Sequence, residues 1–515
     1  MLNRFFGQNT HTYLHILGLS AIAFGLCWSK AVMSVGMMLI ALNVLLEADF
    51  RSYWGRMKSN RAFLLILVFF WLHALSLLWS DNIDYGIQDF KAKLPIFVIP
   101  TVLCWKPVTK QIHINLILTA FLGSLIFTSI YNVLAYQQVF GSRAYDDIRG
   151  LSLFCSHIRY ALLISLGAGV SIVAAIRIRK WAIPFVILSL WFVAYTLYSQ
   201  VITGAITMAG VIAIASISFL SKRSKLLSIG VLVFSVSVVS AIAFWLFSPL
   251  DIDPKEYENL DRRTPKGNWY SHTLDLISSE TGRPILIYVC EPELEREWNK
   301  RSKIPYRGYN VQGDQVNFTL IRYMESKNLR KDGMDFAKLS DKDIRNVEMG
   351  CASVNHSGLM ARMHSLKDEL NNEEDPNGHS LLQRMEYWKG AWTLARTNLF
   401  IGLGSGDVQD AFNHYYDRTN SPLLEENRKR AHSQFLTVLL TFGLPGFILF
   451  MVLIVYSFKR LTDNRHLIGL FALSIAVLSF FMEDTLETQT GATFFALFFG
   501  LYVLRSKRLE QESSQ

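Results

Sequence analysis

Long apolar runs repeat along this sequence, and they limit the folds open to it more than any other feature. About twelve of them are near or above the length that a helix needs to cross a bilayer. They cover residues 13–28, 31–46, 62–78, 87–103, 112–134, 156–176, 181–197, 203–220, 226–247, 435–458, 467–481 and 492–504. Since backbone polar groups inside a bilayer need partners within the protein, such runs form helices. Composition agrees, because 51% of the residues are hydrophobic and 18% are charged, against about 25% charged residues in soluble domains. We expect an all-α polytopic membrane protein with about twelve transmembrane helices.

A polar stretch separates the ninth apolar run from the tenth. It contains a strand-like run at 285–289 and charged helical patterns at 291–303 and 318–327. These patterns predict a large loop domain of mixed structure. The expected organisation is transmembrane helices 1–9 in residues 1–250, the loop domain in 251–431, transmembrane helices 10–12 in 432–504 and a cytoplasmic tail in 505–515.

Lysine and arginine concentrate in alternate connections between the apolar runs. The connection after the second run carries Arg51, Arg56, Lys58 and Arg61, whereas the short outer loops together carry only Lys30, Lys91, Lys93, Arg143 and Arg149. Basic connections stay on the cytoplasmic side. This pattern predicts that both termini are cytoplasmic and that the loop domain is extracytoplasmic.

Several classes of protein and site are disfavoured. The net charge is +9, but the basic residues form short clusters between apolar runs, so we expect no nucleic-acid partner. The loop has no close histidine pair, and we expect no metal site and no cofactor. Two D-x-D patterns, at 251–253 and 341–343, leave a divalent metal as a minor alternative. Cys290 and Cys351 either form a disulfide or remain isolated thiols.

Ionisable residues near the predicted outer ends of the spans are the first candidates for a site. They are His157, Arg159, His432, Glu483, Asp484 and Glu487. Charge at membrane depth is costly and suggests a function, although residues at headgroup level cost little. His432 is expected to open a helix, with Gly443 and Gly446 below the imidazole on the same helix face. The glycine-rich segment 402–406 is either a phosphate cradle or a plain turn.

The sequence around His432 resembles the signature of the bacterial O-antigen ligases. That signature is His, then Asn, Ser or Gln, nine residues, Gly, two residues, and Gly, Thr or Tyr. His432, Ser433, Gly443 and Gly446 fill it without a gap. The preceding stretch, from Arg384 to the glycines of 402–406, is similar to the arginine- and glycine-rich region of the ligase and polymerase superfamily. The number of spans, the large loop and the acidic turn at 481–487 match as well.

The resemblance implies a metal-independent membrane glycosyltransferase of lipopolysaccharide biosynthesis. Such an enzyme transfers a polysaccharide from an undecaprenyl diphosphate carrier to lipid A core on the periplasmic face of a Gram-negative inner membrane. His432 would be the catalytic base or would orient the acceptor hydroxyl. Five arginines would hold the departing diphosphate, because guanidinium binds phosphate bidentately: Arg384 by motif position, Arg159 and Arg149 by location, and Arg428 and Arg430 as neighbours of His432. Ser433, Gly443, Gly446 and Glu483 would support the site.

The resemblance has one departure and leaves alternatives. Many family members carry an arginine near the start of the eighth span, where residues 201–204 here read Val-Ile-Thr-Gly. An O-antigen polymerase or a protein O-oligosaccharyltransferase of the same superfamily would show the same motif. A twelve-helix transporter is a more remote alternative, because transporters usually place their sites near the bilayer midplane.

Overall fold

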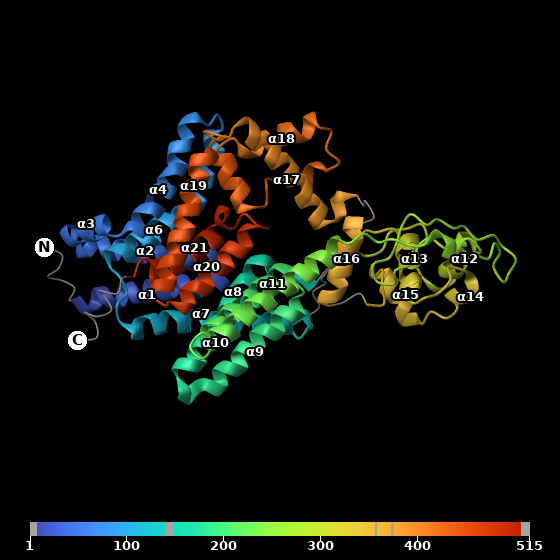
Figure 1. The fold of residues 1–515 in the computed structure, drawn as a ribbon, viewed down its shortest axis with the longest axis horizontal. Helices are drawn as coiled ribbons and strands as arrows, with labels where there is room; N and C mark the ends of the chain where they lie inside the picture. The colour runs from blue at the N-terminus through green and yellow to red at the C-terminus, as the bar shows by residue number, and fades with distance from the viewer. Residues whose placement is uncertain (1–7, 141–147, 356–357, 372–374, 506–515) are drawn as a thin grey trace. The chain divides into compact units, whose positions relative to one another are not determined.

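The computed structural model describes residues 8–140, 148–355, 358–371 and 375–505, and helices predominate among them (Figure 1). Only isolated β-bridges occur within these ranges. The chain divides into two compact units. Unit 1 comprises Met1–Ser235 and Gln383–Gln515, and unit 2 comprises Val236–Leu382.

Nine helices of the described residues are long and apolar enough to cross a membrane. They are α1 (Gln8–Trp28), α2 (Lys30–Glu47), α4 (Arg61–Ser76), α7 (Gln111–Tyr136), α8 (His157–Arg177), α9 (Ala182–Ser199), α10 (Ile202–Leu220), α11 (Lys225–Phe247) and α19 (Gln434–Asp463). Three shorter apolar segments coincide with other expected spans: α6 (Leu94–Trp105), α20 (Leu467–Phe480), and α21 (Gln489–Phe498) with η9 (Phe499–Val503). An all-α polytopic membrane fold is therefore confirmed, while the count of twelve spans stays a prediction.

The expected fourth span, 87–103, is not one continuous helix. It divides into α5 (Ile83–Ala92) and α6, with Lys93 at the junction. Lys93 is buried and engages two carboxylates. The apolar pattern hid this charged junction, which belongs to the candidate site.

The helices of unit 1 pack around one large apolar core. Within it α1 packs on α2 and α7, and α8 packs on α9, α10 and α20. Helix α11 differs, because exposed apolar side chains such as Leu226 and Phe234 cover most of its surface. Exposed apolar surface over a whole helix is what lipid contact requires. The chain is thus a multi-pass membrane protein.

Unit 1 also contains shorter helices. They are α3 (Phe50–Ser59), η2 (Leu77–Trp79), η3 (Ile148–Leu151), η4 (Arg179–Trp181), α17 (Ser380–Thr397, which begins in unit 2), α18 (Val408–Arg418), η7 (Glu425–Asn427) and η8 (Thr485–Glu487). Apart from Arg505, the expected tail 505–515 lies outside the described residues.

Unit 2 has its own apolar core, built on Trp298, Tyr306, Tyr323 and Phe336. Its helices are η5 (Pro254–Tyr257), α12 (Glu291–Arg301), α13 (Val316–Ser326), α14 (Gly333–Phe336), α15 (Asp341–Glu348), α16 (Leu359–Asn371) and η6 (Pro376–Gly378). The helical patterns at 291–303 and 318–327 correspond to α12 and α13. The strand-like run at 285–289 makes only isolated bridges, from Val289 to Ser271 and Lys331.

Two sequence features of unit 2 have structural explanations. Cys290 and Cys351 are free thiols. In the second D-x-D pattern, Asp341 pairs with Arg301, while Asp343 caps α15 and binds Lys327. Both carboxylates therefore serve protein partners.

Candidate active site

His432 lies in an unusual backbone conformation just before α19. Its φ angle is +44°, in the left-handed region that residues with a β-carbon rarely adopt. Helix α19 begins two residues later, at Gln434, with Ser433 as its N-cap. The expectation that His432 opens the helix is therefore wrong, because a left-handed residue cannot be part of a right-handed helix.

A carboxylate and an arginine lie beside the imidazole. Nδ1 of His432 is buried, makes no hydrogen bond to the described residues, and is 3.7 Å from Oε2 of Glu483, an ion-pair distance. The other oxygen of Glu483 binds Nη2 of Arg384 at 2.6 Å. The ring of Tyr387 stacks on the imidazole with 5.4 Å between centroids. The histidine side chain is 31% exposed, so a substrate can reach the ring.

The electrostatics keep Glu483 ionised. Burial alone would raise its pKa, but the nearby His432 and Arg384 outweigh burial and lower the pKa below its ordinary value. A charged carboxylate at Nδ1 favours the tautomer with a proton on Nδ1. The lone pair is then on Nε2, which can accept a proton from a substrate.

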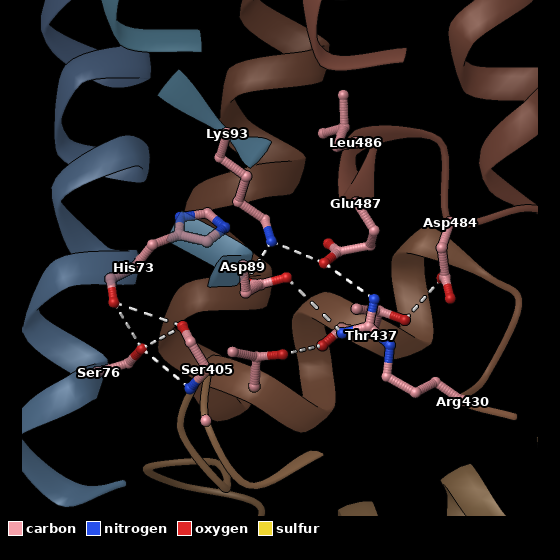
Figure 2. Close-up of polar contacts among 12 residues, drawn as sticks. His73, Ser76, Asp89, Lys93, Ser405, Arg430, Thr437, Asp484, Leu486 and Glu487 are labelled. Carbon is pink, nitrogen blue, oxygen red and sulfur yellow. Dashed lines mark hydrogen bonds and ion pairs between the residues drawn. The ribbon is translucent and has the colours of Figure 1, made fainter. Parts of the chain in front are cut away.

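A second carboxylate, Glu487, is part of a buried ring of ion pairs (Figure 2). Its Oε2 lies 2.7 Å from Nζ of Lys93 and 3.3 Å from Nη2 of Arg430. Asp89 closes the ring, since it pairs with Lys93 and its Oδ1 is 3.8 Å from Nη1 of Arg430. We call these four residues the Glu487 ring. They come from α5, the α5–α6 junction, the segment before α19, and η8.

Charges in and beside the ring are unequally stabilised. Burial would raise the pKa of Glu487, but Lys93 and Arg430 lower it well below its ordinary value. Nearby, burial raises the pKa of Asp484, whose Oδ1 accepts a 2.7 Å hydrogen bond from Thr437. Glu487 is thus ionised within the ring.

Hydrogen bonds hold the glycine-rich segment 402–406 against two other parts of unit 1, and we call this segment the latch. Its amides donate to protein acceptors: Leu403 to Leu440 O, Gly404 to Thr441 O, Ser405 to Ser76 Oγ and Gly406 to Ser80 Oγ. Ser405 Oγ also hydrogen-bonds Ser76 Oγ (Figure 2). A phosphate cradle needs unused amides, so this segment is a turn that joins α19 to the end of α4.

The motif glycines Gly443 and Gly446 have different roles. Gly443 has φ +64° and ψ −166°, and this conformation breaks α19. Carbonyls near the break accept hydrogen bonds from amides of the latch. A β-carbon on Gly443 would lie 2.6 Å from the carbonyl carbon of Phe400. Gly446 is packed against Phe442 and Leu72. The sequence predicted one continuous helix face with the glycines below the histidine, and the break at Gly443 makes that geometry wrong.

Comparison with known families assigns the region that contains this histidine. Residues 350–451 match the family model described as O-antigen ligase. The chain therefore carries a domain of the O-antigen ligase family. The match includes His432, Ser433 and both motif glycines, together with Arg384, Arg428 and Arg430. No curated protein matches the chain.

Within the ligase domain, the three candidate arginines all have carboxylate partners. Arg384 pairs with Glu483, Arg430 with Glu487 and Asp89, and Arg428 with Asp417 at 2.6 Å. The predicted supporting residue Ser433 is buried and donates to Phe480 O at 3.2 Å. Arg384 and Glu483 are thus brought to His432, while Arg428 is directed to an exposed partner on α18.

The two candidate arginines outside the ligase domain are placed differently. Arg159 lies in the first turn of α8, and its Nε is buried without a hydrogen-bond partner in the described residues. Arg149 lies in η3, but its side chain is outside the described residues.

Sequence reasoning missed Asp89, Lys93, Gln434 and Tyr387 as parts of the candidate site. Lys93 interrupts an apolar run, and a charge inside such a run was the available signal. Gln434 and Tyr387 gave no comparable signal, because their contacts with Glu487 and His432 arise only in the folded chain.

Proposed function

We propose that this protein is an O-antigen ligase-type glycosyltransferase. It transfers a polysaccharide from an undecaprenyl diphosphate carrier to lipid A core at the periplasmic face of a Gram-negative inner membrane. The observation that carries the proposal is the His432–Glu483–Arg384 arrangement, in which His432 and Arg384 belong to a domain of the O-antigen ligase family. The basic connections, which predict that both termini are cytoplasmic, support the periplasmic location.

In the proposed reaction, His432 acts as the base. Its Nε2 takes the proton of the acceptor hydroxyl while the hydroxyl oxygen bonds to the anomeric carbon of the donor sugar. The bond between that carbon and the phosphate oxygen breaks, and its electron pair leaves with the undecaprenyl diphosphate. Glu483 stabilises the imidazolium that forms, as a carboxylate does in other histidine-based sites.

The leaving diphosphate needs cationic partners. Arg159 is the strongest candidate, because the structure gives its guanidinium no ion pair within the described residues and leaves Nε without a hydrogen bond. Guanidinium stabilises the charge that grows on the leaving oxygen. Arg384 first holds Glu483 in place and adds positive charge beside the histidine. Arg430 acts inside the Glu487 ring, so its contribution to the diphosphate is indirect.

The decisive experiment reads the lipopolysaccharide and the lipid-linked glycan pool of a deletion strain. The strain is complemented with the wild type, with His432→Ala, or with His414→Ala, which changes an exposed histidine of the same domain. We expect wild type and His414→Ala to restore O-polysaccharide on lipid A core. His432→Ala should leave rough lipopolysaccharide and long carrier-linked chains.

Other outcomes would redirect the proposal. A deletion strain that accumulates single carrier-linked units indicates a polymerase, and normal lipopolysaccharide with missing glycoproteins indicates a protein O-oligosaccharyltransferase. Purified protein that moves the glycan without forming a covalent product would indicate transport.

A further inference from the structure

We infer that Glu487 is a positioning residue that holds the residues on both sides of the catalytic histidine. Lys93 and Asp89 in turn hold Glu487 in place. This inference rests on the proposed function, since it assumes that His432 acts on the substrate. It assigns a role to three residues that lie outside the ligase domain match.

Each carboxylate oxygen of Glu487 holds one side of the histidine segment. Oε2 accepts from Arg430, two residues before His432, at 3.3 Å. Oε1 accepts from Nε2 of Gln434, two residues after His432, at 3.0 Å. The Gln434 side chain also accepts a 2.7 Å hydrogen bond from the amide of Leu486. The five residues from 430 to 434 are therefore fastened to η8 at both ends.

The backbone of His432 needs such fastening. Left-handed conformations of residues with a β-carbon persist only where surrounding contacts determine them. Ser433 follows with extended backbone, and α19 starts at Gln434. Contacts at 430 and 434 hold the ends of this irregular segment and set the direction in which the imidazole projects.

The rest of the ring fixes Glu487 itself. Lys93 is buried and reaches Glu487 from the α5–α6 junction, and Asp89 pairs with both Lys93 and Arg430 (Figure 2). Two cations and two acidic groups alternate around the ring. Because a buried charge without a partner is strongly unfavourable, each member holds its neighbours in place.

Positioning is separable from the chemistry of the site. Glu483, not Glu487, lies beside the imidazole, and Arg384 pairs with Glu483. Loss of Glu487 leaves His432, Glu483 and Arg384 in the chain and changes only the orientation of the His432 side chain. Misplacement of a reacting group by about 1 Å can lower a rate about 100-fold.

The test uses a charge-balanced double variant. Lys93→Met with Glu487→Leu removes one cation and one anion, so Asp89 and Arg430 remain paired. We expect this variant to keep a melting temperature closer to wild type than Glu487→Leu alone. Its kcat should fall about 100-fold while KM changes little. The assay uses full-length protein in nanodiscs, with the strain's own carrier-linked polysaccharide as donor and its rough lipopolysaccharide as acceptor.

A single variant outside the ion pairs covers the case in which the double variant fails to fold. Gln434→Met keeps side-chain volume and releases one flank of His432 while the ionic ring stays complete. We expect kcat to fall at least about tenfold with KM unchanged. Wild-type kcat in Gln434→Met, or in a folded double variant, would overturn the inference.

The failure of this inference differs from the failure of the proposed function. If His432→Ala retains ligation, the proposed function fails. If His432→Ala is inactive while Gln434→Met has wild-type kcat and KM, the function stands and Glu487 is only structural.

Discussion

Each of the two units buries a lysine against a glutamate, and the two pairs differ in what they hold. In unit 2, Lys331 pairs with Glu325, six positions away, and the pair fixes the chain after α13. In unit 1, Lys93 pairs with Glu487, 394 positions away, and the ring continues to both flanks of His432. Both lysines are about equally buried. Burial of a charge therefore does not distinguish a site, whereas convergence of distant segments on irregular backbone does.

The largest expected effect compares the two glutamates. Glu487→Ala and Glu325→Ala each remove a carboxylate partner of a buried lysine, which should cost about 3–5 kcal/mol of stability. Only Glu487→Ala should also lower kcat of the folded fraction. Thermal unfolding in nanodiscs and the transfer assay measure both quantities. Equal loss of kcat in both variants would remove the functional distinction between the pairs.

A second comparison sets Glu483 of the acidic turn against an exposed glutamate of unit 1. Glu483→Gln removes the charge that stabilises the imidazolium, so kcat should fall about 100- to 1,000-fold. The protein level in the membrane should remain near wild type, because glutamine keeps the hydrogen-bonding shape. Glu425→Gln, an exposed change in the same unit, serves as the matched control. Initial rates of product formation decide the outcome, and a wild-type rate would rule out the role of Glu483.

The latch offers a third, smaller effect. Gly443→Ala places a β-carbon against Phe400 at a positive φ angle, which should cost about 1–3 kcal/mol. Gly123→Ala in α7 meets nothing within 4 Å and should be neutral or stabilising by up to about 1 kcal/mol. Melting temperatures of the two variants check this contrast. If both behave alike, the break in α19 is not required.

The membrane fold could be predicted because it depends on local patterns. Apolar runs, turns and charged helical stretches gave the main spans and the helices α12 and α13. The motif also led to His432, Arg384 and Glu483, which the structure brings together. In these cases the sequence information lies within a few residues of the feature.

The rest depends on contacts that no local pattern contains. Lys93 is separated from Glu487 by most of the chain, so only folding reveals the ring. Gly443 was expected to pack on a helix face, because periodicity assumes an unbroken helix and cannot show a positive φ angle. The sequence left an anion site and a plain turn as alternatives for segment 402–406, because the contacts that its amides make with α4 and α19 join distant parts of the chain.

The latch at the break of α19 has a consequence for how the protein is made. Unpaired backbone carbonyls cost several kcal/mol within a bilayer, and α19 exposes those of Leu440 and Thr441 at its break. The amides that pair with them, from Leu403 and Gly404, leave the ribosome before α19 does. The partner thus exists when the broken helix enters the membrane. A circular permutation that placed the 399–406 segment after α19 would reverse this order, and we expect such a chain to insert poorly even though its finished contacts would be the same.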